Sequence, residues 1–321
     1  MNENPLVTVL IPVYNRPSVI NTINSILTQS YRNLEILVID NASTDNTVEV
    51  IKSLRDERIR LIVNENNLGQ TGSMNRGLQL AKGKYIARID SDDIATPDRI
   101  ELQVKFLESN EDYVLVGSWI QYISDDDVLG GVVKTCTTDE GLRFMQTFFC
   151  GIHHPTAMYR TDIIKDIGIE YDPNISMAED YDMWRKLLKY GKGLNIGKVL
   201  VYYRRGCNND SIKHLKEMIQ ETRLVRRKVC SDLVLSDNMK KRLEKALSIA
   251  EKDRQTLIEA ISYFSFMLSF FKKSIKRESP DYPILHKYIY QMSYGTCIQN
   301  SNALWALPLQ LLYNSLRKKM H

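Results

Sequence analysis

Cysteine is scarce in this sequence, and the few cysteines form no recognisable pattern. The 321 residues include five of them, an odd number without Cys-x-x-Cys spacing, which argues against a disulfide framework and a cysteine-based zinc site. Scattered free thiols fit a reducing compartment, so we expect a cytoplasmic protein. The five are Cys136, Cys150, Cys207, Cys230 and Cys297.

Long hydrophobic runs are also missing. No apolar stretch reaches the roughly 18 residues that a membrane-spanning helix needs. The apolar run near the N-terminus follows no basic segment and is interrupted by Pro12 and Asn15, so we interpret it as a buried strand rather than a signal peptide. With 43% hydrophobic and 26% charged residues, the composition is that of an ordinary globular protein.

Charge is distributed unevenly along the chain. Residues 213–321 carry a net charge of +10, and residues 1–212 carry −6, which predicts two regions with different partners. In the basic region, apolar-aromatic stretches at 263–277 and 302–320 end in Lys and Arg, as at a membrane interface. The alternative is a helical bundle that packs on residues 1–212 or on a second subunit of a homo-oligomer. We expect no nucleic-acid partner.

Strand-like and helix-like segments alternate at short spacing over the first hundred residues. This alternation predicts an α/β fold with a doubly wound, mostly parallel sheet, followed by a helical C-terminal region. The expected strands are 6–14, 34–39, 58–63, 85–89 and 199–204, with a hairpin over 113–123 and 131–134; the expected helices begin at Pro17, after 41–47, and at 71–81, 97–109 and 178–190, with helices only from 213 onward.

Polar residues follow the expected strands, where ligands bind in open α/β sheets. The cluster Asp90-Ser91-Asp92-Asp93 directly follows a strand, and its carboxylates repel one another unless a cation or solvent relieves them. Mg²⁺ or Mn²⁺ held by one or two carboxylates and by phosphate oxygens would neutralise a departing diphosphate. A solvated turn or helix cap is the alternative.

Three further candidates have a functional and an ordinary interpretation. Tyr14 and Asp40 end the first two expected strands; they either bind a nucleotide base or are a core aromatic and a turn cap. Glu179-Asp180 opens a helix, where carboxylates are commonly caps, although Asp180 in a cleft would serve as a general base. His154, in the pair with His153, either contacts an acceptor or forms a local hydrogen bond.

Several ordered motifs together resemble the family 2 glycosyltransferases, which have the GT-A fold. The resemblance covers about residues 5–205 and rests on VTVLIPVYNR (7–16), SILTQSYRNLEILVIDNASTDNT (25–47), NLGQTGSMNRGLQLAKGKYIARIDSDD (67–93), P-DRI (97–100), HHPTAMYR (153–160) and AEDYDMWRKL (178–187). It implies an inverting, metal-dependent transfer of a hexose or N-acetylhexosamine from a nucleotide-diphospho-sugar, with UDP expected. The implied acceptor is a saccharide or a lipid-pyrophosphate-linked saccharide in surface polysaccharide synthesis, at the inner face of the plasma membrane.

The resemblance also assigns roles to particular residues. On the donor side it implies a base pocket at Pro12, Tyr14 and Asp40, a donor loop at Gly69, a residue that holds loop and helix together at Asn75, and the DxD motif at Asp90, Ser91 and Asp92. Asp92 is the implied ligand of Mn²⁺ or Mg²⁺. Asp180 is the implied catalytic base, with Glu179 and His154 on the acceptor side.

Two departures from the family pattern affect these expectations. Asn41 stands where a second acid usually follows Asp40, and Gly206-Cys207-Asn208 stands where many relatives carry a histidine, so no histidine ligand is assigned. A non-catalytic nucleotide-sugar-binding scaffold is the alternative function. A third function, that of a nucleotidyltransferase, usually requires a glycine-rich loop after the first strand. Residues 11–18 contain no glycine, which argues against this function.

Overall fold

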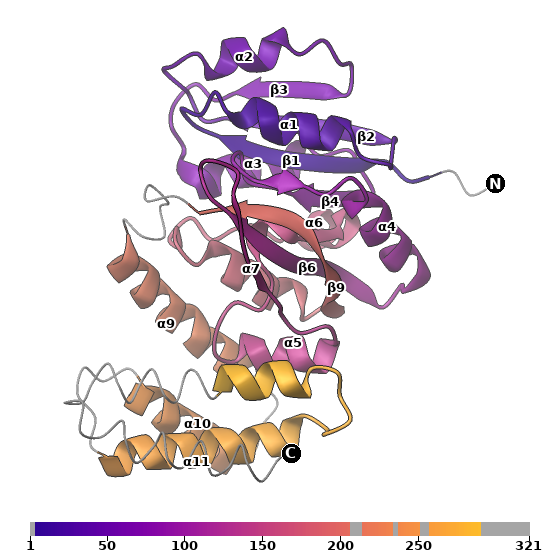
Figure 1. The fold of residues 1–321 in the computed structure, drawn as a ribbon. Coiled ribbons are helices and arrows are strands. Elements are labelled where there is room, and N and C mark those ends of the chain that lie inside the picture. Colours follow the sequence, from indigo (N-terminus) through magenta and orange to yellow (C-terminus); the bar gives the residue numbers. More distant parts are fainter. Residues whose placement is uncertain (1–3, 206–213, 234–236, 251–256, 290–321) are drawn as a thin grey trace. The chain divides into compact units, whose positions relative to one another are not determined.

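The computed structural model describes residues 4–205, 214–233, 237–250 and 257–289 (Figure 1). The chain forms two compact units, Met1–Arg226 and Arg227–His321, and the division falls inside helix α9 (Leu215–Asp232). The functional division at 212/213 stays a prediction. The stretch 302–320 lies outside the described residues.

A sheet, which has nine strands within the described residues, forms the centre of the first unit (Figure 1). Its order is β3-β2-β1-β4-β8-β6-β9-β5, and β7 pairs with β6. The first four strands in this order are parallel, as the strand-helix alternation predicts. The strands are β1 (Val7–Val13), β2 (Leu34–Asp40), β3 (Ile59–Val63), β4 (Tyr85–Arg88), β5 (Ile94–Ala95), β6 (Tyr113–Ile123), β7 (Leu129–Val133), β8 (Met158–Arg160) and β9 (Lys192–Arg204).

The sheet becomes mixed beyond β4. Strand β8 runs antiparallel to both β4 and β6, whereas β6 and β9 are parallel. Strands β6 and β7 form the hairpin expected from the sequence, with Ile120 opposite Val133. Strand β5 pairs antiparallel with β9 and was not expected. Only β5, β7 and β8 oppose the common direction, so the described sheet is mostly parallel.

Helices cover both faces of this sheet. They are α1 (Val19–Leu27), α2 (Thr47–Ser53), α3 (Gly69–Leu80), α4 (Arg99–Ser109), α5 (Asp139–Gln146), the 3-10 turn η1 (His154–Thr156), α6 (Thr161–Ile167) and α7 (Glu179–Leu187). Acids in the first turn of α7 and Arg185 and Lys186 in its last turn complement the helix dipole. Gly77 of α3 lies against Leu10, where a Cβ would come within 2.3 Å of a Leu10 methyl group, so any larger residue there would force the buried Leu10 side chain to move.

Side-chain alternation along the strands divides the core into two layers. Val9 of β1 packs in the layer of α1 and α4, whereas Leu10 packs in the layer of α3 and α7. On β4, Ile86 belongs to the second layer. Because residues two apart on a strand share a face, the side chain of Arg88 also enters the layer that holds Trp184 of α7. This alternation brings one end of the sheet and the start of α7 into the same region.

The second unit is helical where it is described. It contains the end of α9 from Arg227 onward, with α10 (Asp237–Ala250) and α11 (Leu257–Ser274), and α10 packs against α11. Within α11, the rings of Phe266 and Phe270 stack on each other, and Phe271 contacts Tyr282. Among the described residues, no helix is both long and apolar enough to cross a bilayer.

Candidate active site

The parallel register collects the ends of three strands at one edge of the sheet. Val13 lies opposite Asp40, and Leu10 lies opposite Arg88. Backbone bonds continue the ladder past the strands, from Asn41 N–H to the Val13 carbonyl at 2.8 Å. The segments that follow β1, β2 and β4 therefore lie close together, and these segments carry the polar residues noted in the sequence.

Asp40 lies at the bottom of this edge. Its side chain is fully buried, and Oδ1 accepts a hydrogen bond from the Ser43 N–H at 3.0 Å. The other oxygen, Oδ2, has no hydrogen-bond partner within the described part of the chain. Pro12 of β1 is paired with Ile39 beside it, and Tyr14 is 46% exposed. An unpaired carboxylate oxygen and an exposed aromatic ring at neighbouring strand ends suit a flat ligand with an N–H donor.

Asn41 has a structural use that an acid could not serve. Its Nδ2 donates to Asn67 Oδ1 at 2.8 Å, while its Oδ1 accepts from Asn64 Nδ2 at 3.1 Å and from the Leu68 N–H at 2.8 Å. Aspartate has no N–H to give to Asn67. The following Gly69 adopts φ +71 where α3 begins, in the left-handed region that favours glycine. The loop thus depends on both the amide and the glycine.

The acidic cluster starts with an ion pair inside the protein. Nη1 of Arg88, whose side chain is fully buried, lies 2.5 Å from Asp90 Oδ2. Burial alone would raise the pKa of Asp90, but the Arg88 charge beside it holds that pKa below its ordinary value. Arg88 Nε and Nη2 have no hydrogen-bond partner among the described residues. Asp90 is therefore ionised at neutral pH, and half-buried Ser91 follows it.

Asp92 and Asp93 face different surroundings. Asp92 is paired with Arg16 of the β1 loop, with 2.9 Å between Nη1 and Oδ2, and its side chain is 21% exposed. Asp93 is buried and accepts a hydrogen bond from the Arg204 N–H at 2.7 Å. Burial and the Asp90 charge raise the pKa of both. Asp93 therefore anchors the loop to β9, and Asp92 remains accessible.

These residues fit a divalent cation that is shared with a phosphate group. Within the described ranges, no set of three His, Cys, Asp or Glu side chains is arranged to hold a metal ion. Mg²⁺, however, is often bound through one or two carboxylates together with substrate phosphates and water. The crowded carboxylates at 90, 92 and 93, with the pKa of Asp92 raised by burial and by the Asp90 charge, would be relieved by such a cation.

Asp180 lies in the first turn of α7 with both carboxylate oxygens engaged. Oδ1 accepts from the Tyr181 N–H at 2.7 Å, and Oδ2 lies 3.5 Å from the thiol of Cys150. The residue is half-buried, and burial raises its pKa above the ordinary value. A carboxylate that is partly accessible and has a raised pKa suits a proton acceptor.

Glu179 and His154 form a buried pair. Glu179 Oε1 accepts from Gln70 Nε2 at 2.9 Å and lies 3.6 Å from His154 Nδ1. Burial raises the pKa of Glu179 to about 7 and, together with the Arg88 charge, lowers that of His154 to about 3. His154 is thus neutral, and its Nε2 lies 2.9 Å from the Tyr171 hydroxyl. These are local contacts, and the acceptor-side roles of both residues stay predictions.

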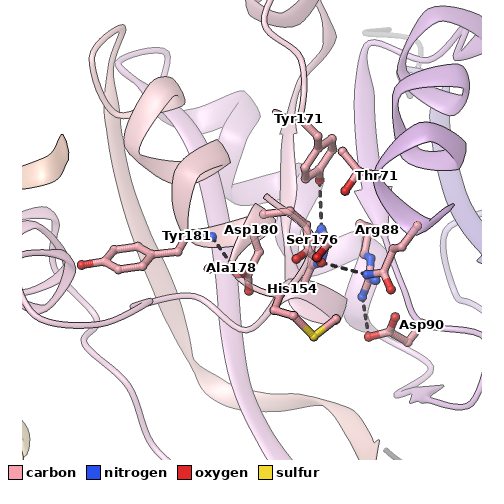
Figure 2. Close-up of polar contacts among 12 residues, drawn as sticks. Thr71, Arg88, Asp90, His154, Tyr171, Ser176, Ala178, Asp180 and Tyr181 are labelled. Carbon is pink, nitrogen blue, oxygen red and sulfur yellow. Dashed lines mark hydrogen bonds and ion pairs between the residues drawn. The ribbon is translucent and has the colours of Figure 1, made fainter. Parts of the chain in front are cut away.

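The two ends of the site approach each other around Arg88. Figure 2 shows Arg88 beside Asp90, with His154 and Asp180 in the same neighbourhood. The Arg88 charge acts on Asp90, His154 and Glu179 alike. The acidic cluster and the start of α7 therefore form one electrostatic unit.

Asn75 links α3 to the segment before α7. Its Nδ2 donates to the Tyr171 carbonyl at 2.9 Å, and its Oδ1 accepts from the Tyr171 N–H at 2.8 Å. These bonds engage both ends of the amide with the backbone of Tyr171, and the expected role of Asn75 in holding the Gly69 loop to the helix stays a prediction. Contact with a donor stays a prediction for Asn75.

Several residues of this region were missed in the sequence. Arg88 could have been noticed, because it stands two positions before Asp90 and shares its face of the chain. Tyr171 and Cys150 gave no signal, since each reaches the site only through tertiary structure. The same holds for Glu221 of α9, which accepts hydrogen bonds from the backbone before α7.

Known proteins are similar to this chain in sequence and in fold. The family model described as glycosyl transferase family 2 matches residues 8–168. The Escherichia coli UDP-Glc:alpha-D-GlcNAc-diphosphoundecaprenol beta-1,3-glucosyltransferase WfaP is 31% identical over 223 residues, 69% of this chain and 86% of that protein.

Two solved structures are similar to the whole architecture. S. aureus TarS 1-349 in complex with UDP-GlcNAc gives a TM-score of 0.60 at 19% identity, covering 92% of this chain and 83% of that one. Mannosyltransferase PcManGT from Pyrobaculum calidifontis, in complex with GDP-Man and Mn2+, gives 0.59 at 16% identity, covering 97% and 87%. The α/β fold of GT-A type with a helical C-terminal region, expected from the sequence, is confirmed.

Proposed function

Because the chain belongs to glycosyltransferase family 2, we propose that it transfers a hexose or N-acetylhexosamine from a UDP-sugar to an acceptor hydroxyl, with inversion at the anomeric carbon. The observation that carries the proposal is the electrostatic unit around Arg88. It joins a carboxylate cluster suited to a diphosphate, at Asp90 and Asp92, to a carboxylate suited to proton transfer, at Asp180.

The strand-end edge would hold the nucleotide. The buried Oδ2 of Asp40, which has no partner among the described residues, would accept from a uracil N–H, and the exposed Tyr14 ring would stack on the face of the base. Asp90, ionised beside Arg88, would accept from a ribose hydroxyl. Asp92 would be the protein ligand of Mn²⁺ or Mg²⁺, for which Arg16 would have to yield it. The bound cation would stabilise the negative charge of the leaving diphosphate.

Asp180 would accept the proton of the acceptor hydroxyl as the oxygen attacks. The new bond joins this oxygen to the anomeric carbon from the face opposite the diphosphate, while the carbon–oxygen bond to the diphosphate breaks and its electron pair leaves with UDP. An α-linked donor therefore gives a β-linked product. The raised pKa of Asp180 supports this role, because a stronger base takes the proton more readily.

We propose a lipid-pyrophosphate-linked saccharide as the acceptor. The support is WfaP, whose name gives a GlcNAc-diphosphoundecaprenol acceptor and a UDP-Glc donor. Such an acceptor would place the chain at the cytoplasmic face of the plasma membrane. The basic helices after 213 are the proposed contact with that surface, and a second subunit is the alternative.

A donor screen tests the proposal. Purified full-length protein with Mn²⁺ is incubated with a panel of nucleotide-sugars and lipid-linked acceptors, and release of the nucleotide and the product linkage are measured. We expect UDP release that needs both the acceptor and the divalent ion, with inverted configuration by NMR. Tight UDP-sugar binding without turnover over the whole panel would favour the scaffold function instead, and retention of configuration would reject the proposed mechanism.

A further inference from the structure

Helix α9 places a carboxylate against the backbone that leads into α7. Glu221 Oε2 accepts from three consecutive N–H groups, those of Ser176 at 2.9 Å, Met177 at 2.6 Å and Ala178 at 3.2 Å. Glu221 Oε1 also accepts from the Ser176 hydroxyl at 3.2 Å. One side chain from a helix more than forty residues away thus satisfies the backbone immediately before Glu179 and Asp180.

From this geometry we propose that Glu221 is a positioning residue for the reaction, which holds the start of α7 so that the Asp180 carboxylate meets the acceptor hydroxyl. The proposal rests on the proposed function of Asp180 as the base. Glu221 itself contacts three backbone N–H groups and the Ser176 hydroxyl, so it takes no part in the chemical step.

The need for such a contact follows from helix physics. The first N–H groups of a helix have no partner inside it, and the Ala178 cap that precedes α7 makes no side-chain cap hydrogen bond. Of the three N–H groups that bind Glu221, that of Ala178 belongs to this cap, and those of Ser176 and Met177 precede it. A carboxylate beside a helix N-terminus also complements the helix dipole. Besides Glu221, Thr71 donates a side-chain hydrogen bond to this stretch, at 3.2 Å to the Ile175 carbonyl.

A second contact of α9 supports the same role. Arg226 Nε donates to the Phe148 carbonyl at 2.8 Å, two residues before Cys150, whose thiol faces Asp180. Helix α9 is therefore fastened on both sides of the proposed base, through Glu221 to the segment before it and through Arg226 to the segment that carries Cys150. Val225 between them is fully buried.

Charge removal and hydrogen-bond removal can be separated at this position. Glu221→Ala removes the acceptor, whereas Glu221→Gln keeps one amide oxygen that can accept from the N–H groups and an NH₂ that can donate to Ser176. Glu217, one turn earlier on α9, is exposed, and Glu217→Ala is the matched control. Asp180→Asn gives the reference for loss of the base.

The experiment measures kcat, acceptor KM, UDP-sugar Kd and amide hydrogen exchange for the full-length variants. Because a misplacement of 1 Å can cost about 10²-fold in rate, we expect Glu221→Ala to lower kcat by about that factor while the Kd stays within about twofold. Glu221→Gln should recover most of kcat, and Glu217→Ala should match wild type. Exchange should quicken at 176–182 in Glu221→Ala and stay unchanged in β1.

The outcomes separate this inference from the proposed function. Wild-type kcat in Glu221→Ala, with Asp180→Asn inactive, overturns the positioning role and leaves the function standing. Loss of donor binding together with kcat, or faster exchange throughout the first unit, also overturns it, because the role would then be general stability. If the wild type transfers no sugar, the proposed function fails, and unchanged exchange at 176–182 would still reject the contact's role in ordering this segment.

Discussion

The two ends of the site are held in different ways. The carboxylates at 90, 92 and 93 are fixed from within the sheet and its strand ends, by Arg88 two residues upstream, by Arg16 after β1 and by Arg204 of β9. The start of α7 is instead held from outside the sheet. Its partners are the thiol of Cys150, Gln70 on α3 and Glu221 on α9.

This difference predicts different sensitivities. Parallel register fixes the strand ends through many backbone bonds, so the loss of one side chain there removes a function but displaces little. The α7 start depends on a few side-chain contacts with distant segments, so changes far from the chemistry should reach Asp180. We call the cluster at 90–93 the proposed diphosphate end and the start of α7 the proposed base end. We expect activity to be lost at the diphosphate end mainly when its own carboxylates are changed. At the base end, we expect activity to be lost also when the residues that hold Asp180 in place are changed.

The largest expected effect comes from Asp180, the proposed base. Asp180→Asn keeps the shape of the side chain and its bond from the Tyr181 N–H, but an amide cannot take the acceptor proton. We expect kcat to fall by about 10³-fold, within the range known for general bases, with the UDP-sugar Kd unchanged. Initial rates of UDP release with saturating acceptor measure this.

The matched control for that variant is an acid with no place in the site. Asp126 is exposed in the turn between β6 and β7, and Asp126→Asn should behave as wild type. If Asp180→Asn transferred sugar at a near-wild-type rate, Asp180 would not be the base. The contrast between the two ends of the site would then not hold.

The next effect concerns the diphosphate end. Asp92→Ala removes the accessible carboxylate of the cluster and leaves Arg16 without its partner. Since the loss of leaving-group stabilisation typically costs about 10²- to 10³-fold, we expect kcat to fall by that factor. The Mn²⁺ concentration for half-maximal rate should also rise.

Hydrogen exchange separates this variant from those at the base end. Asp92→Ala should leave exchange at 176–182 as in wild type, because the strand ends do not hold that segment. Equal metal dependence in Asp92→Ala and wild type would show that Asp92 is not the ligand.

A third effect concerns stability and pH at the base end. Burial raises the pKa of Glu179 in the folded protein from its ordinary value of 4.5 to about 7. A folded pKa above the unfolded one contributes stability that is complete below about pH 4.5 and is lost as pH rises through 7. From pH 5 to 8, wild type should therefore lose about 2 to 3 kcal/mol relative to Glu179→Gln.

Urea unfolding of both proteins at the two pH values measures this difference. The same comparison with Glu217→Gln, at an exposed position of α9, should show no difference from wild type. An identical pH dependence of stability in wild type and Glu179→Gln would mean that folding does not shift the pKa of Glu179. Burial beside His154 would then have no effect on this carboxyl group.

The same division explains what could be predicted from the sequence. Strand periodicity and short connections located β1 to β4 and the polar residues at their ends. This was possible because the local sequence pattern identifies each strand, and ligands bind beyond the carboxyl ends of parallel strands. Asp40, Asp90 and Asp92 therefore stood out. The two-residue strand β5 did not, since Ile94–Ala95 is too short to carry a periodic pattern.

The contacts that hold the start of α7 could not be predicted from the sequence, for a physical reason. From local sequence alone, Asp180 is a helix-start acid, and only resemblance to a family suggested more. Its supports lie 30 residues away at Cys150, and Glu221 lies 43 residues from Ala178, so no local pattern links them. The pKa of Glu179 likewise follows from burial, which is a property of the folded packing.

The smallest expected effect tests whether the strand-end edge tolerates a change of one atom. Asn41→Asp replaces the Nδ2 that donates to Asn67 by an oxygen that would face the Asn67 Oδ1 at about the same place, while the bonds from Asn64 and Leu68 can persist. One lost hydrogen bond between part-buried groups costs about 1 kcal/mol, so the free energy of unfolding should fall by that amount in urea titrations. Asn41 holds the loop before Gly69 and has no proposed contact with the sugar, so kcat should stay within about twofold. The UDP Kd should rise by less than about tenfold, because the loop is only slightly loosened. If kcat falls more than UDP affinity, Asn41 acts in the chemical step, and the strand ends are then as sensitive to distant changes as the start of α7.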